Sequence, residues 1–166
     1  MDSLRTPTTL PRRVLLALAG SGLGALAAAA LAPGGASAAE LTGSALHDLE
    51  QANVHTVRDF CASWSTLDVN RVAPFFADDA VYRVIETAKP TVGHDAIVKL
   101  IGGFLQRAQK VRFEIHRMYA AGPIVVNERH DHFTPHQGAE RVFHVAGVFF
   151  VRNGKIAEWT DYRVAS

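Results

Sequence analysis

The stretch RVFHVAGVFFVRNGKIAEWTDYRV, residues 141–164, indicates the fold class more clearly than any other part of the chain. Asn153-Gly154 divides it into two runs, 141–152 and 156–164, that are rich in β-branched and aromatic residues. An Asn-Gly pair between two such runs is typical of a tight β-hairpin, because both residues tolerate the positive φ angles of the turn. We therefore predict two antiparallel strands at this end of the chain.

Upstream of this hairpin, the hydrophobic pattern predicts three helices and three further strands. The expected helices span residues 43–65, a short segment that starts at Leu67-Asp68 with Asp68 as its cap, and residues 94–106. The expected strands span residues 80–85, 111–120 and 124–134. Helices followed by an antiparallel sheet are typical of an α+β fold. We therefore predict one domain in which three helices pack on one face of a curved sheet.

The overall composition places the chain among folded globular proteins. Of its 166 residues, 48% are hydrophobic and 20% are charged, a balance that excludes a mainly disordered chain. Seventeen basic and sixteen acidic residues leave a net charge of +1, which excludes a protein that binds nucleic acid through bulk charge. Cys61 is the only cysteine, so the chain can form neither an internal disulfide nor a multi-cysteine metal site.

The first residues of the chain have the composition of an export signal. Arg12-Arg13 precedes an apolar run over 14–33, and Ala36-Ser37-Ala38 forms a small-residue cleavage site. Paired arginines before such a run are typical of the twin-arginine export route. We therefore predict a signal peptide at 1–38, a domain at 39–166, a periplasmic or secreted location, and no membrane partner after cleavage. An uncleaved membrane anchor is the alternative, because the apolar run is long enough to span a bilayer.

Charged residues occupy one predicted strand at positions where a half-buried strand would carry apolar ones. Successive side chains of a strand point to opposite faces, so Asn127, Arg129 and Asp131 share one face. If this face lies under the helices, Arg129 and Asp131 are buried together, and Asp161 on the last strand can join them. Two close carboxylates of different proton affinity can act as an acid and a base. A structural ion pair or an exposed charged face is the alternative to a catalytic site.

These charged residues belong to two short motifs, Arg129-His130-Asp131 and Trp159-Thr160-Asp161-Tyr162. Together the motifs resemble the limonene-1,2-epoxide hydrolase family, which has the cone-like fold of the nuclear transport factor 2-like, or SnoaL-like, proteins. The resemblance covers residues 57–164, and its supporting stretches are 76–82, 93–96 and 147–149. It implies a curved antiparallel or mixed sheet with the three helices on its concave face.

The resemblance assigns a role to each residue of the charged group. In that family, one aspartate protonates the epoxide oxygen, a second takes a proton from water, and an arginine holds their charge states apart. The matching residues are Asp131 as the acid, Asp161 as the base and Arg129 as the bridge, with Tyr82 helping to hold the water. Because the acid and the base act together, the resemblance implies no metal and no cofactor. It also implies a small lipophilic epoxide as the substrate and a homodimer.

A largely apolar pocket around these residues would suit such a substrate. The residues predicted to line it are Cys61, Trp64, Val84, Phe104, Phe113, Phe133, Phe143, Val145 and Arg163. Val84 departs from the family pattern, because it stands where the family has an asparagine that helps to hold the water. Glu86 or Thr87 would have to replace that amide. Arg163 also departs from the pattern, because it adds a positive charge where the family tends to have an aromatic residue.

Two other classes of function remain open from the sequence. An isomerase or polyketide cyclase of the same fold would use a buried carboxylate on a hydrophobic substrate. A non-catalytic protein would hold a small ligand in the pocket, and the charged residues would be structural. His130 and His132 share a strand face opposite to Arg129, and His144 can join them from the next strand. We expect these to be solvated or interface histidines rather than metal ligands.

Overall fold

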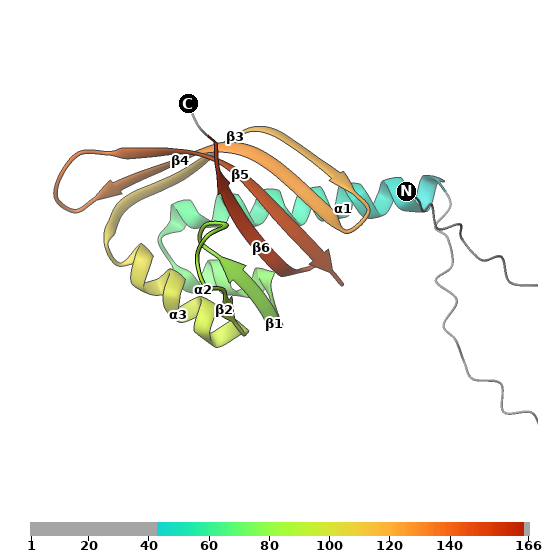
Figure 1. The fold of residues 1–166 in the computed structure, drawn as a ribbon, viewed down its shortest axis with the longest axis horizontal. Helices are drawn as coiled ribbons and strands as arrows, with labels where there is room; N and C mark the ends of the chain where they lie inside the picture. Colours follow the sequence, from blue (N-terminus) through green and yellow to red (C-terminus); the bar gives the residue numbers. More distant parts are fainter. Residues whose placement is uncertain (1–42, 165–166) are drawn as a thin grey trace, which may run out of the picture. The chain divides into compact units, whose positions relative to one another are not determined.

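The computed structural model describes residues 43–164, and the predicted signal peptide at 1–38 lies outside them. Within residues 43–164 the chain forms three α-helices and one six-stranded sheet (Figure 1). The helices are α1 (Gly43–Ser63), α2 (Val69–Val72) and α3 (His94–Leu105), with 3-10 turns at Trp64–Thr66 and Ala73–Phe75. The strands are β1 (Phe76–Arg83), β2 (Thr91–Val92), β3 (Ala108–Ala121), β4 (Ile124–Pro135), β5 (Arg141–Arg152) and β6 (Lys155–Arg163). No helix in this part of the chain is long and apolar enough to cross a bilayer.

The sheet is mixed, with the strand order β2-β1-β6-β5-β4-β3. Strands β3 to β6 form an antiparallel meander, whereas β1 pairs with β6 in parallel. In Figure 1 the long strands curve, and the helices pack against the sheet. The predicted α+β class, with three helices packed against a curved sheet, is therefore confirmed.

Two local predictions are also confirmed. Asn153 and Gly154 connect β5 to β6 with φ angles of 52° and 71°, as a tight turn between twisted strands requires. Asp68 caps α2, because its side chain accepts a hydrogen bond of 2.9 Å from the backbone N–H of Asn70. Both features depend on neighbouring residues alone.

The first edge of the sheet differs from the prediction. Strand β1 begins at Phe76 rather than Ala80, and ends at Arg83. The earlier start was missed because Asp78 and Asp79 interrupt the apolar pattern, and both side chains are exposed. The two-residue strand β2 was not predicted, since its place in the sheet depends only on its pairing with β1.

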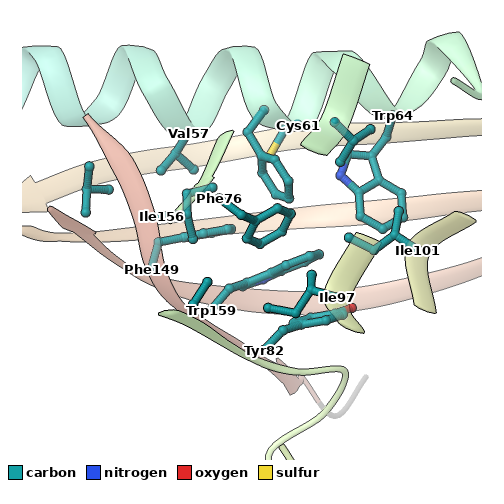
Figure 2. Packing of buried hydrophobic residues seen from close by; sticks show 14 of the residues in the cluster. Val57, Cys61, Trp64, Phe76, Tyr82, Ile97, Ile101, Phe149, Ile156 and Trp159 are labelled. Atoms are coloured by element: carbon teal, nitrogen blue, oxygen red, sulfur yellow. The ribbon is translucent and has the colours of Figure 1, made fainter. Parts of the chain in front are cut away.

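An aromatic core joins α1 to the middle of the sheet (Figure 2). The ring of Phe60 on α1 meets several other rings edge to face, namely those of Trp64, Phe75, Phe76, Phe149 and Trp159. Trp159 on β6 in turn stacks on Phe149 and Tyr82, with interplanar angles of 12° and 15°. Such contacts each stabilise a core by about 1 kcal/mol beyond burial. They hold Trp159 rigidly, two residues before Asp161.

Candidate active site

The charged face of β4 points into the domain. Asn127 and Arg129 are fully buried, and Asp131 is partly buried. Asp161 on β6 is buried as well, and strand β5 lies between the two strands. The register aligns Asn127 with Gly147 of β5 and Gly147 with Asp161. Since Gly147 has no side chain, Arg129 and Asp161 can meet across β5.

One guanidinium group joins both carboxylates. Arg129 donates from Nε to Asp131 Oδ1 at 2.7 Å and from Nη2 to Asp131 Oδ2 at 3.1 Å. The same Nη2 donates to Asp161 Oδ2 at 2.8 Å. Paired contacts of this kind are stronger than neutral hydrogen bonds and fix the guanidinium plane. The structure therefore brings together the three residues predicted to form the relay.

Neighbouring side chains hold this group in place. The indole N–H of Trp159 donates to Asp161 Oδ1 at 2.7 Å, and Arg129 Nη1 donates to Asn127 Oδ1 at 2.8 Å. Phe113 lies against the guanidinium, with Arg129 Cζ 4.8 Å from its ring centre. Asn127 was placed on this face by the sequence, but no role was assigned to it.

Cys61 lies behind the charged group and does not line the cavity, although it was predicted to do so. Its Sγ accepts a hydrogen bond of 3.6 Å from the side-chain amide of Asn127. Burial raises the pKa of the thiol to about 12, so the group stays neutral near pH 7. Cys61 is therefore a packing residue that supports Asn127.

A cavity of about 320 Å³ opens above the two carboxylates. This volume is at the lower end of the range for small-molecule sites. The predicted residues that line it are Tyr82, Trp64, Val84, Phe104, Phe113, Phe133, Phe143, Val145 and Arg163, together with Asp131 and Asp161. The cavity is also lined by residues that were not predicted from the sequence, namely Ile85, Leu100, Ile101, Arg107, Val111, His132 and Trp159. The apolar ones could have been found from the buried face of α3 and the start of β3.

Comparison with known proteins identifies the family. A family model described as a SnoaL-like domain matches residues 57–159. The chain belongs to the SnoaL-like domain family. This assignment confirms the fold family that the two motifs indicated. No curated protein matches the chain.

Solved structures similar to this SnoaL-like domain include one described as an LEH-like epoxide hydrolase of M. tuberculosis. It is 27% identical, the match covers 69% of this chain and 84% of that chain, and the TM-score is 0.63. A putative polyketide cyclase from Xanthomonas campestris pv. campestris is 19% identical, with coverages of 69% and 92% and a TM-score of 0.62. A hypothetical protein with a ketosteroid isomerase-like fold from Catenulispora acidiphila is 21% identical, with coverages of 67% and 86% and a TM-score of 0.59. The last two show the fold alone.

Burial raises the pKa of both carboxyl groups in the site of this SnoaL-like domain. Desolvation raises the pKa of Asp131 from 3.8 to about 6, although the charge of Arg129 lowers it. Burial also raises the pKa of Asp161, and there hydrogen bonds from Arg129 and Trp159 both oppose the rise. Interacting carboxyl groups titrate as a pair, so this pair can hold one proton in weakly acidic solution.

The wall of the cavity next to Tyr82 is apolar. Tyr82 is buried, and burial raises the pKa of its hydroxyl well above 10, so the phenol stays protonated. Val84 and Ile85 line the cavity beyond it, with Val84 53% exposed. Glu86 and Thr87, predicted as substitutes for the missing amide, are exposed and are not among the lining residues.

Most of the predicted histidine cluster lies on the other side of β4. His130 Nδ1 shares a hydrogen bond of 3.0 Å with His116 Nε2, and His144 Nε2 donates to Glu128 Oε1 at 3.1 Å. His132 differs. The two-residue period of a strand predicted that it faces away from Asp131, but it also lines the cavity. Within residues 43–164, no group of three or more His, Cys, Asp or Glu side chains is arranged to hold a metal ion.

Gly147→Ala is expected to destabilise this SnoaL-like domain. An added Cβ would lie 2.2 Å from Arg129 Nη1 and 2.7 Å from Asn127 Oδ1, far inside contact distance. Overpacking of a tight core costs about 1–3 kcal/mol, and here it would also displace the guanidinium. Urea denaturation monitored by circular dichroism measures the change. Gly103→Ala is the matched control, because nothing lies within 4 Å of its added Cβ on α3. That control is expected to stabilise the helix, and equal effects of the two variants would contradict the argument.

Proposed function

We propose that this chain is a cofactor-independent hydrolase that adds water to a small lipophilic epoxide. The observation that carries the proposal is the pair Asp131 and Asp161, held by one buried arginine at the edge of an apolar cavity. Such a pair can supply an acid and a base to one substrate at the same time. The likeness to the LEH-like epoxide hydrolase of M. tuberculosis supports this reaction.

The hydrogen bonds favour Asp131 as the acid and Asp161 as the base. Both oxygens of Asp161 accept hydrogen bonds, one from Arg129 and one from Trp159, which stabilises its ionised form. Both oxygens of Asp131 also accept hydrogen bonds, but among the described residues Arg129 donates both of them, and burial raises the pKa of Asp131 to about 6. We therefore assign the shared proton to Asp131, whose hydrogen bonds come from one donor residue, and the ionised form to Asp161, whose hydrogen bonds come from two; both side chains line the cavity.

In the proposed reaction, Asp131 gives its proton to the epoxide oxygen while a water oxygen attacks one epoxide carbon. Asp161 takes a proton from that water, the ring C–O bond breaks, and its electron pair stays on the oxygen. The product is a diol. Asp131 is then ionised and Asp161 protonated, so one proton returns from Asp161 to Asp131 before the next turnover. Arg129 contacts both carboxylates and stabilises whichever of them is charged.

The acid role of Asp131 predicts that kcat/KM falls as the pH rises. Asp131 acts in its protonated form, and burial raises its pKa to about 6. Above this pH the protonated fraction of the free enzyme falls about tenfold for each pH unit, and kcat/KM for a neutral epoxide is expected to fall with it. Initial rates between pH 5 and pH 9 measure the profile. A value of kcat/KM that rises from pH 6 to pH 8 would contradict the acid role.

The first test of the proposed reaction follows the oxygen atom of water. The purified protein is incubated with a panel of lipophilic epoxides in oxygen-18 water, and the products are analysed by mass spectrometry. Hydration predicts a diol that carries one labelled oxygen, formed faster than in a reaction without protein. A folded protein that forms no labelled diol from any epoxide of the panel would overturn the proposal.

A second candidate is a proton-transfer isomerase or cyclase. The observation that favours it is Val84, which stands in the cavity wall where the resemblance implies an asparagine amide. Valine offers no hydrogen bond to a water molecule, so one support of the nucleophile is missing. The same incubation separates the two reactions, because an isomerase converts its substrate to a product of unchanged mass. A protein that only binds ligands gives neither product.

Export of the protein and formation of a homodimer stay predictions. The signal at 1–38 with Arg12-Arg13 implies a periplasmic or secreted protein, and the resemblance implies a homodimer. Amino-terminal sequencing of the exported protein tests cleavage after Ala38. Sedimentation equilibrium tests the oligomeric state.

A further inference from the structure

The cavity carries a cation that the proposed reaction does not use. Arg163 is the last residue of β6 and follows Asp161 by two positions, so both side chains lie on the same face of the strand. Both line the cavity. The side chain of Arg163 is exposed, whereas Asp161 is buried. The guanidinium group of Arg163 therefore lies where the cavity meets solvent.

Among the described residues, no carboxylate pairs with Arg163. The ion pairs within residues 43–164 engage other basic side chains, and Asp131 and Asp161 both pair with Arg129. Glu128 is not a partner of Arg163 either, because it pairs with Arg117 and His144. A cation at the rim of a largely apolar cavity is thus left with its hydrogen-bond donors available to a ligand.

The charges of the site add up to a net positive cavity. In weakly acidic solution Asp131 and Asp161 share one proton, and Arg129 balances their remaining negative charge. At pH 8, above the pKa of about 6 of Asp131, both carboxyl groups are ionised and one negative charge is left over. Two further guanidinium groups, those of Arg107 and Arg163, then remain on the cavity lining. Arg107 has a second explanation, because it follows α3, where a cation stabilises the negative end of the helix. Arg163 has no such explanation.

We propose that the cavity takes an amphipathic anion, with its apolar body against the aromatic walls and its carboxylate at Arg163. The proposal names a substrate class for the site of the proposed function. The guanidinium group suits a carboxylate because it can donate two parallel hydrogen bonds. The wall that would receive the apolar body is formed by Phe104, Phe113, Phe133 and Phe143. A substrate of this class is an epoxide of a medium-chain carboxylic acid.

Binding of two probes tests the proposal without any chemical turnover. Decanoate and decanol share an apolar chain and differ in their charge at pH 8. Titration calorimetry of the full chain is expected to give a dissociation constant about five- to tenfold lower for decanoate than for decanol. The preference is expected to shrink in 1 M sodium chloride, because Arg163 is exposed to screening ions. Equal binding of the two probes, or no measurable binding of either, would overturn the proposal.

Three variants assign the preference to a residue. Arg163→Gln is expected to bind decanoate about five- to tenfold more weakly and decanol unchanged. Arg58→Gln is the matched control, because Arg58 is an exposed arginine of α1 that does not line the cavity. It is expected to keep the full preference. Loss of the preference in Arg107→Gln but not in Arg163→Gln would overturn the assignment to Arg163.

Failure of this proposal is distinguishable from failure of the hydrolase proposal. A preference for decanoate that depends on Arg163 supports the ligand class even if no epoxide yields a diol. Labelled diol formed equally well from an epoxy acid and from its methyl ester supports hydration and overturns the ligand class. If both proposals hold, Arg163→Gln raises KM for the epoxy acid and leaves KM for the ester unchanged.

Discussion

Asp131→Asn is expected to lower kcat/KM for epoxide hydration by about a thousandfold, within the range that general acid catalysis contributes. Asparagine keeps the shape of the side chain, and its oxygen can still accept a hydrogen bond from Arg129. It has no acidic proton to give to the epoxide oxygen, so the ring must open without assistance. The rate of labelled diol formation measures the loss. Circular dichroism checks that the variant remains folded.

The matched control for this variant is Asp79→Asn. Asp79 is an exposed aspartate of β1 that pairs with Arg152, away from the cavity. The same chemical change there is expected to leave turnover unchanged. Asp161→Asn is expected to lose activity as Asp131→Asn does, because the water then has no base. Full activity in Asp131→Asn would remove this residue from the acid role.

The sequence predicted best those features that depend on neighbouring residues. The turn at Asn153-Gly154 and the cap at Asp68 each need only a few adjacent residues to form. The burial of Arg129 follows from the two-residue period of a strand, given that one face meets the helices. Features of this kind carry their physical cause within a short window of sequence.

The parallel pairing of β1 with β6 could not be derived in this way. These strands are far apart in the chain, and their pairing depends on how the helices return the chain to the sheet. The start of β1 was missed for a related reason. Asp78 and Asp79 break the apolar pattern there, but their side chains are exposed, so they do not prevent this segment from forming a strand. Long-range pairing thus overrides the local hydrophobic pattern.

In the candidate site, too, the residues set by local sequence were predicted and those set by strand register were not. The strand period and the two motifs predicted Arg129, Asp131 and Asp161 as a group. The roles of Gly147 and Asn127 in the site were missed, because these roles depend on the register across β4, β5 and β6. A glycine in the middle of a strand is a signal for close approach, and it could have indicated that a large side chain passes over this position.

Arg129→Ala is expected to destabilise the domain by about 3–5 kcal/mol, the usual cost of leaving buried charges without a partner. Asp161 is buried, Asp131 is partly buried, and both depend on this guanidinium for hydrogen bonds. The loss is a large part of the stability of a typical domain, so a substantial unfolded fraction is expected at 37 °C. Urea denaturation at pH 8 measures it. Arg112→Ala is the control, because its ion pair with Glu114 is exposed to solvent and is expected to contribute little to stability.

The pH dependence of this loss separates charge from volume. Without Arg129, burial raises the pKa of both aspartates further above 3.8, since the group that lowered their pKa is gone. The folded variant then binds more protons than the unfolded chain above pH 4, so its stability increases as the pH falls. The deficit relative to the native protein is therefore expected to be smaller at pH 5 than at pH 8. Arg129→Met fills most of the lost volume but restores no charge, so it should show the same dependence. A deficit that is equal at both pH values, and that methionine repairs, would mean that Arg129 stabilises the fold by packing alone.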